Sequence, residues 1–166
     1  MQQLCQDAGS ISFERGLGLD ERNRLWEARH QAYESIKHTH VGADPFVADI
    51  AVPISRYPEI VAFTEQTIRE QGVAGYPFGH AGDGNLHVVF MGDAQNEEGW
   101  ARVQRANQAI VGRALDLQGT ATGEHGVGIG KRRFMEREHG KSLAVMRQIK
   151  ATLDPEGILN PGKIFP

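Results

Sequence analysis

Residues 79–87, Gly-His-Ala-Gly-Asp-Gly-Asn-Leu-His, constrain the fold of this chain more than any other segment. The pair Asp83-Gly84 stands between two apolar or aromatic arms within residues 76–91. Such a pair predicts a β-hairpin with a two-residue loop, because a type I′ turn needs positive φ at both central positions. Counting outward from this loop places His80 directly opposite His87.

Directly opposed residues of a hairpin share one face, with Cβ atoms about 4.5 to 5.5 Å apart. Two imidazoles at that separation can hold one metal ion, so His80 and His87 are candidate ligands. On a single strand their spacing would place them on opposite faces. A pair of histidines that only form hydrogen bonds near a turn stays open as an alternative. Asp83 is expected to be a turn residue and not a ligand.

A second glycine-rich segment, residues 119–130, carries an adjacent Glu124-His125 pair. Glu124 would complete a set of two histidines and one carboxylate, which leaves a coordination position open for substrate or water. Adjacent side chains of an extended segment point apart. The two residues are therefore expected to have different roles, with His125 free to act as a base. Alternatively, Glu124 caps a helix or pairs with one of the cations at 131–133.

The spacing of apolar residues predicts four helices and one further strand. The helices are expected from Asp20 to about Ile36, from Pro58 to near Gly72, over 96–117 with Gly119 as the stop, and over 141–153 before Asp154-Pro155. The strand is expected over 46–54 and runs out at Pro53. This order of elements predicts an α+β fold, an antiparallel sheet with helices on one face.

Composition limits the classes of protein to which the chain can belong. Its 166 residues, 40% hydrophobic and 23% charged, suit one folded domain over 1–166. No apolar run reaches the roughly 18 residues of a transmembrane helix. The net charge of -3 disfavours a nucleic-acid-binding face. A single cysteine, Cys5, and no secretory leader predict a reducing compartment, the cytoplasm.

With these segments in place, the chain resembles the C-terminal part of the FAD-linked oxidases, a family that oxidises D-2-hydroxy acids. Within the family the pattern is closest to the D-lactate dehydrogenases of the cytochrome type, and glycolate oxidase flavin subunits are also similar. The matching stretches follow one another along nearly the whole chain: residues 25–30, 49–56, 79–87, 119–128 and 153–163.

The resemblance implies a ferredoxin-like sheet that forms the substrate or cap domain of a flavin oxidoreductase. Family members bind FAD mainly through an N-terminal domain. No such domain is present in this sequence, so the chain is expected to be a fragment, inactive alone, whose partner is that flavin-binding domain. The implied reaction is oxidation of a small D-2-hydroxy acid, D-lactate or glycolate, to the 2-oxo acid.

The resemblance also implies a role for each candidate residue. A divalent metal, zinc or manganese, would be held by His80, His87 and Glu124. His125 would be the base beside the flavin, and Arg29 would bind the substrate carboxylate. The cofactor-binding residues would be Asn85, Asn160 and Lys163.

The same comparison of patterns also concerns the length of the substrate. Valine stands at 47 and 89, where D-2-hydroxyglutarate members carry lysine and asparagine, and this disfavours a long diacid substrate. From the residues alone, Arg29 is explained equally well by stacking on Trp26 or Tyr33. The sequence is also compatible with a homodimer and with peripheral attachment to a membrane through a partner.

Two other functions stay open. The first is a metal-dependent hydrolase, because two histidines and a glutamate can also activate water. Against it, the chain has no His-Glu-x-x-His helix that would supply a general base. The second is a binding or assembly module that keeps the fold without activity.

Overall fold

The computed structural model describes residues 1–165, without the side chain of Ala28. The chain forms two compact units, Met1–Thr39 and His40–Pro166, which are described separately. The first unit contains α1 (Gln2–Asp7) and α2 (Gly18–Thr39). Helix α2 confirms the first predicted helix and extends it at both ends. Asp20 and Glu21 lie in its first turn and Lys37 and His38 in its last turn, which are the positions that the helix dipole favours for these charges.

The second unit is built on three antiparallel strands: β1 (Asp44–Ala51), β2 (Ala74–His80) and β3 (Asn85–Gly92). Strand β3 lies between the other two. Strand β1 begins two residues before the predicted strand and ends before Pro53, where the chain turns into the 3₁₀ segment Ile54–Arg56. A single bridge pairs Ala51 with Thr120.

Two long helices confirm their predictions, α3 (Tyr57–Gln71) and α4 (Glu97–Asp116). Helix α3 ends at Gly72, whose φ of 59° is the left-handed value that glycine adopts without strain. Helix α4 begins where the Asn96 side chain accepts the Gly99 N–H at 2.8 Å. Because α3 connects β1 to β2 with β3 inserted between them, the topology is the split β-α-β of ferredoxin-like folds.

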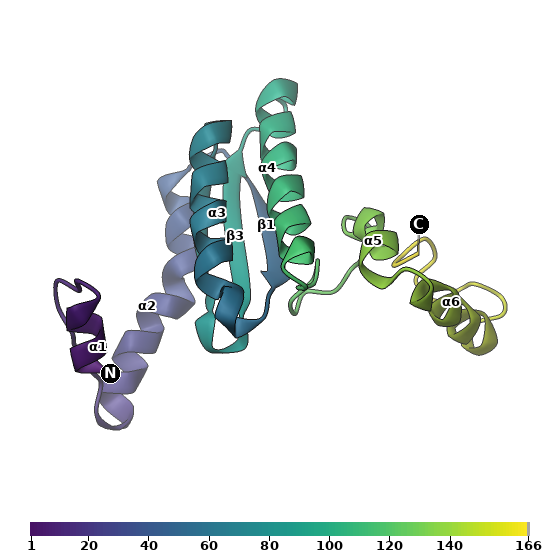
Figure 1. Cartoon of the computed structure of the whole chain (residues 1–166). Coiled ribbons are helices and arrows are strands. Elements are labelled where there is room, and N and C mark those ends of the chain that lie inside the picture. The colour runs from purple at the N-terminus through teal and green to yellow at the C-terminus, as the bar shows by residue number, and fades with distance from the viewer. Residues whose placement is uncertain (166) are drawn as a thin grey trace. The chain divides into compact units, whose positions relative to one another are not determined.

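Alternate residues of each strand divide the sheet into an apolar face and a second face, called here the polar face, on which His80, Asn85, His87 and Asp49 lie beside apolar residues such as Val47 and Val89. Figure 1 shows α3 and α4 side by side over one face. The buried core there is made of Ala48, Ile50, Ile60, Leu86, Val88, Phe90, Val103, Ala106 and Ile110. Burial of each large side chain of this kind stabilises the fold by about 1.5 to 3 kcal/mol. The prediction of helices on one face of an antiparallel sheet is confirmed, and the opposite face is free to carry polar residues.

The hairpin forms, but its predicted register is wrong by two residues. The loop contains a 3₁₀ segment, Ala81–Asp83, and only Gly84 has positive φ, so the turn is not type I′. His80 therefore pairs with Asn85. The reason is tertiary: the Val52 N–H binds the Gly84 carbonyl at 2.9 Å, and a Cβ at Gly84 would lie 2.0 Å from the Val52 oxygen.

An even register shift keeps each side chain on its predicted face. His87 pairs with Phe78 and is two residues from Asn85, so His80 and His87 are diagonal neighbours instead of direct partners. Their ring centroids are 5.6 Å apart. The proximity that was predicted for the two imidazoles is confirmed, although the pairing that was predicted to cause it is not.

The chain ends in short helices after the second glycine-rich segment. These are the 3₁₀ segment Arg132–Phe134, α5 (Met135–His139) and α6 (Ser142–Leu153). Helix α6 confirms the fourth predicted helix and ends before Asp154-Pro155, as expected. A backbone hydrogen bond ties the last residues to the glycine-rich segment, from the Ile164 N–H to the Gly128 carbonyl at 2.9 Å.

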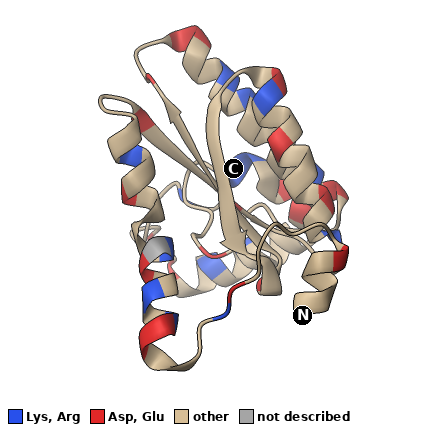
Figure 2. Cartoon of the chain, turned by 90° about the vertical axis from the view of Figure 1, so that its left-hand side faces the viewer, with Lys and Arg blue, Asp and Glu red and all other residues tan. Residues whose placement is uncertain are grey.

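The surface charges of the helices are mixed in sign. Figure 2 shows acidic and basic residues in alternation along individual helices. Among the described helices, none is long and apolar enough to cross a membrane.

Candidate metal centre

The three predicted metal ligands come together on the polar face of the sheet. Donor atoms of His80, His87 and Glu124 all lie within 4.8 Å of one another. Glu124 Oε1 is 3.1 Å from His87 Nε2 and 3.9 Å from His80 Nε2. Tetrahedral zinc with bonds of about 2.0 to 2.1 Å needs ligand atoms about 3.4 Å apart. The donor set and its spacing therefore fit a divalent ion of the zinc type.

His87 is the buried member of this set. It lies in the middle of β3 and is 3% exposed. Burial lowers the pKa of the His87 imidazole, and the charge of Asp49 opposes this shift only in part. The net effect favours the neutral ring, which is the form that binds a metal. Its Nε2 faces Glu124, and its Nδ1 lies 3.4 Å from Asp49 Oδ1.

The other two candidate ligands are accessible. Side-chain exposure is 33% for His80 and 55% for Glu124. Three protein ligands would leave the fourth position of a tetrahedral ion for water or substrate, whereas structural zinc sites have four protein ligands.

His125 stacks on His87, with ring centroids 5.0 Å apart and planes at 8°. Its Nε2 is 3.8 Å from Glu124 Oε1. The expectation that Glu124 and His125 point apart is wrong, because the segment bends at this point and is not extended. Both side chains face His87. Separate roles for the two residues stay a prediction.

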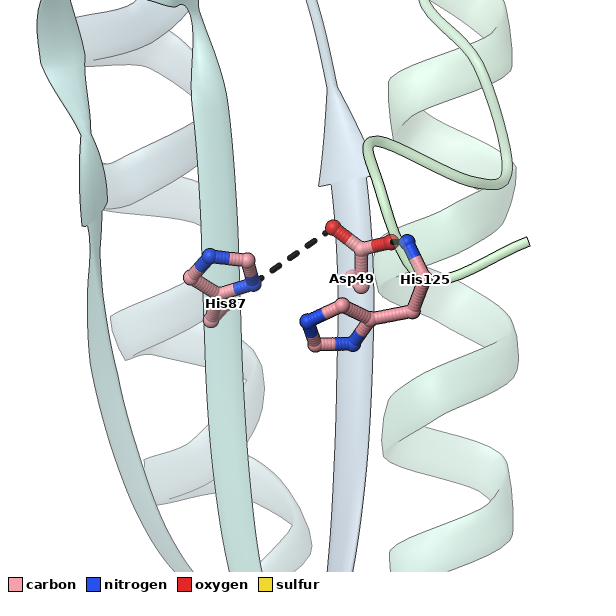
Figure 3. Close-up of side chains that lie close together, drawn as sticks. All are labelled: Asp49, His87 and His125. Atoms are coloured by element: carbon pink, nitrogen blue, oxygen red, sulfur yellow. Dashed lines mark hydrogen bonds and ion pairs between the residues drawn. The ribbon is translucent and has the colours of Figure 1, made fainter. Parts of the chain in front are cut away.

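The bend is held by Asp49, a residue that the sequence analysis did not select. Asp49 pairs with His87 across β1 and β3, and its Oδ2 accepts the backbone N–H groups of Glu124 at 3.0 Å and His125 at 2.9 Å. Figure 3 shows the Asp49 carboxylate between the two imidazole-bearing residues. The available signal was a carboxylate within an otherwise apolar run, residues 45–54.

Asp49 is ionised in spite of its burial. Burial by itself raises the pKa of this carboxyl, but hydrogen bonds and a nearby positive charge together hold it well below its usual range. The groups that do so are the His125 N–H, the Asn85 amide, the Glu124 N–H and Lys131.

Lys131 supplies that positive charge. Its Nζ is 2.8 Å from the Asp49 carbonyl oxygen and 3.2 Å from Oδ2. Lys131 thus pairs with Asp49. It is not the cation that would pair with Glu124 in the alternative prediction. Burial lowers the pKa of the Lys131 ammonium, and the attraction of Asp49 opposes this.

Asn85, predicted to bind the cofactor, is 7% exposed and supports Asp49. Its Nδ2 donates to Asp49 Oδ1 at 2.9 Å and to the Ile50 carbonyl at 3.0 Å. Asn85 Oδ1 is buried without a hydrogen-bond partner among the described residues. A direct contact between Asn85 and a cofactor stays a prediction.

The remaining predicted site residues lie in other segments. Arg29 is half-buried on α2, in the first unit. Asn160 and Lys163 are exposed in the C-terminal segment, and the neighbouring Gly162 carbonyl accepts from Arg132 at 2.9 Å. This joins the C-terminal segment to the 3₁₀ segment Arg132–Phe134, which follows the glycine-rich segment that carries His125.

A pocket of about 490 Å³ lies beside the same glycine-rich segment. Among the predicted site residues, only His125 lines it, together with Lys131, Asn107 and Phe134. It is large enough for part of a small ligand. The metal ligands themselves do not line this pocket.

Comparison with known proteins places these features in context. Residues 1–164 match the family "FAD linked oxidases, C-terminal domain". A probable mitochondrial D-lactate dehydrogenase of Danio rerio is 36% identical over 99% of this chain and 33% of its own length. The mitochondrial D-lactate dehydrogenase [cytochrome] of Kluyveromyces lactis is 38% identical over 99% of the chain and 29% of its length.

Two further proteins are similar. The glycolate oxidase subunit GlcD of Bacillus subtilis is 33% identical over 99% of the chain and 35% of its length. A 4-ethylphenol oxidase from Gulosibacter chungangensis superposes with a TM-score of 0.61 at 18% identity, over 93% of this chain and 32% of that one, which supports the fold alone. The chain thus spans about a third of the length of the curated relatives that it matches.

Proposed function

Because this chain belongs to the FAD-linked oxidase family, as its C-terminal domain, we propose that it forms the metal-binding, substrate-side part of an FAD-dependent dehydrogenase. Its substrate is a small D-2-hydroxy acid, D-lactate or glycolate, which is oxidised to the 2-oxo acid. The observation that carries this proposal is the convergence of His80, His87 and Glu124 beside a further imidazole, that of His125.

His80, His87 and Glu124 would hold a zinc or manganese ion. When bound, the ion would supply Lewis-acid chemistry that lowers the pKa of the substrate hydroxyl, and FAD would supply the acceptor for the hydride. His125 takes the hydroxyl proton at a ring nitrogen, and its stacking on His87 keeps the imidazole in place. Arg29 is proposed to bind the substrate carboxylate, since a guanidinium can donate two parallel hydrogen bonds to it.

The flavin is proposed to lie against the glycine-rich segment and the C-terminal segment that is bonded to it. Asn160 and Lys163 are exposed there and offer an amide and a cation. Apolar side chains are also exposed on α6 and the turn after it: Val145, Ile149, Leu153, Ile158 and Leu159. Exposed apolar surface of this kind supports a partner domain, which is proposed to be the flavin-binding domain.

The residues at positions 47 and 89 support a substrate without a second, distant carboxylate. Val47 and Val89 pair directly, one step along the polar face from Asp49 and His87. Neither can bind a distant carboxylate, so lactate and glycolate are favoured over a long diacid. The cytoplasmic location, attachment to a membrane through a partner, and a homodimer remain predictions; the two D-lactate dehydrogenases named above are mitochondrial proteins.

The test begins with metal analysis of the purified chain. We expect about one equivalent of a divalent metal, lost in His80→Ala, His87→Ala and Glu124→Ala, and retained in the control His139→Ala on α5. In a protein that joins this chain to a flavin-binding domain, the three ligand variants should keep the flavin and lose most D-lactate or glycolate turnover.

Two results would contradict the proposal. Full turnover by metal-stripped, flavin-containing enzyme would remove the role of the metal. Ester or peptide hydrolysis by the isolated chain without flavin would favour the hydrolase instead.

A further inference from the structure

Asp49 is a buried carboxylate that is not among the predicted ligands. Its side chain has no exposed surface, and it lies in the middle of β1. Removing a charge from water costs several kcal/mol unless close partners compensate it. The partners of Asp49 therefore indicate what the charge does.

The two carboxylate oxygens face different parts of the metal centre. Oδ1 faces the sheet, where it accepts from Asn85 Nδ2 at 2.9 Å and lies 3.4 Å from His87 Nδ1. Oδ2 faces the glycine-rich segment and accepts the N–H groups of Glu124 and His125. One carboxylate thus contacts a ligand on β3 and the backbone of a second ligand on the loop.

His87 Nδ1 has no hydrogen bond of normal geometry within the described residues, and Asp49 Oδ1 is the acceptor recorded near it. The distance of 3.4 Å lies just beyond the usual range for N–H···O. A histidine that binds a metal through Nε2 commonly donates its Nδ1–H to a carboxylate, which fixes the tautomer.

A competing interpretation is that Asp49 is itself a ligand. Donor atoms of Asp49, His87 and His125 also lie within 4.8 Å of one another. However, Oδ2 already accepts two backbone N–H groups, and the Lys131 ammonium is 3.2 Å from it. A divalent cation at this carboxylate would meet that positive charge directly, so the second set is disfavoured.

The geometry points to Asp49 as the positioning residue of the metal centre, an inference that rests on the proposed function of that site. Its Oδ1 holds His87 in the Nδ1–H tautomer and leaves the Nε2 lone pair for the ion. Its Oδ2 holds the bend that presents Glu124. Asp49 acts through these two ligands and does not touch the ion.

Asp49→Asn separates these two functions. The Asn carbonyl oxygen can still accept the loop N–H groups and the Lys131 ammonium, so its NH₂ group must face His87. His87 Nδ1 then becomes an acceptor, and its proton moves to Nε2, the ligand atom. The Asn85 amide can turn to present its unpartnered Oδ1 to the new NH₂ group, with loss of its own hydrogen bond to the Ile50 carbonyl.

The experiment measures Zn²⁺ and Co²⁺ affinity of the 166-residue chain, with and without this substitution. We expect Asp49→Asn to weaken both affinities about 10- to 100-fold and to change the visible spectrum of bound Co²⁺. Nitrogen-15 NMR of the histidine rings should show His87 as Nδ1–H in the wild type and as Nε2–H in the variant.

Asp154→Asn is a matched control. Asp154 is also buried and accepts two backbone N–H groups, from Ile158 and Leu159, and a lysine ammonium, from Lys150. It has no histidine among these partners. A similar loss of packing and charge is expected there, with unchanged metal affinity.

The outcomes separate this inference from the proposed function. If the wild type binds Zn²⁺ no more tightly than His80→Ala does, the metal centre itself fails, and the inference with it. If the wild type binds tightly and Asp49→Asn binds equally well, only the role of Asp49 is overturned. Should the variant not fold, the wild-type NMR spectrum decides, since an Nε2–H tautomer of His87 before metal is added contradicts the inference.

Discussion

At position 123 the chain has no room for a side chain. A Cβ there would lie 1.9 Å from Asn85 Nδ2 and 2.5 Å from Asp49 Oδ1. Its φ is not in the left-handed region, so glycine is required at this position by space and not by backbone conformation. Gly123 thereby lets the loop approach the hydrogen bond between Asn85 and Asp49, next to Glu124.

We therefore expect Gly123→Ala to destabilise the fold by about 1 to 3 kcal/mol, because the added methyl group must displace the Asn85–Asp49 pair or the loop. Urea unfolding measures this loss, and Zn²⁺ affinity should fall with it. Gly130→Ala is the control, since nothing lies within 4 Å of its Cβ and its φ is ordinary. Its stability should be unchanged or slightly raised; equal stabilities for the two variants would contradict the packing argument.

Among the elements, α6 depends on the residue at its end. Asp154 accepts the Ile158 and Leu159 N–H groups at 3.0 Å and also contacts Lys150. The hydrogen bond from Lys150 lowers the pKa of the Asp154 carboxyl, against the opposing effect of burial. The same carboxylate thus closes the last helix and holds the turn after it.

Because the pKa of Asp154 is lower in the folded chain than the ordinary 3.8, its stabilising effect is complete above that value and is lost as the pH falls through the folded pKa. We expect Asp154→Asn to lower the urea midpoint at pH 6 and to differ much less from wild type near pH 2.5. Asp116→Asn, which removes the exposed partner of Arg137, should change little at either pH. A gap for Asp154→Asn that widens in acid would contradict this.

For the whole molecule, the two compact units differ in how they are stabilised. No described side chain within Met1–Thr39 is buried, whereas β3 is buried along nearly its whole length. A helix that buries no side chain has little beyond its own backbone hydrogen bonds to stabilise it. Helix α2 carries Arg29, so the residue proposed to bind the substrate carboxylate lies in the less stable unit.

We therefore expect amide hydrogens of α2 to exchange with solvent faster than those of β3 by a factor on the order of 100 or more. Hydrogen exchange followed by mass spectrometry of peptides from the two segments measures this difference. Helix α4 is the control, because it is helical like α2 but buries Val103, Ala106 and Ile110, and it should exchange slowly. Similar protection of α2 and α4 would overturn the expectation.

The sequence by itself determined the local elements and the fact that His80 and His87 lie on the same face of the sheet. Helix spacing, proline and glycine positions predicted α2, α3, α4 and α6 within a few residues, since these signals act over one or two turns. The prediction that these two residues share a face is correct although the predicted register is wrong, because a shift of two residues preserves the face on which a side chain lies. The glycine-rich segment was rightly expected to bring Glu124 to the two histidines.

Only the tertiary structure decided the hairpin register and the residue that supports those ligands. The hairpin register depends on contact between its loop and Val52, at the end of another strand. The place of Asp49 opposite His87 depends on strand order. The hydrogen bond from the Glu124 N–H to the Asp49 carboxylate, which holds the bend, joins residues 75 positions apart. Periodicity describes the neighbours of a residue along the chain, whereas these contacts arise from packing between distant segments.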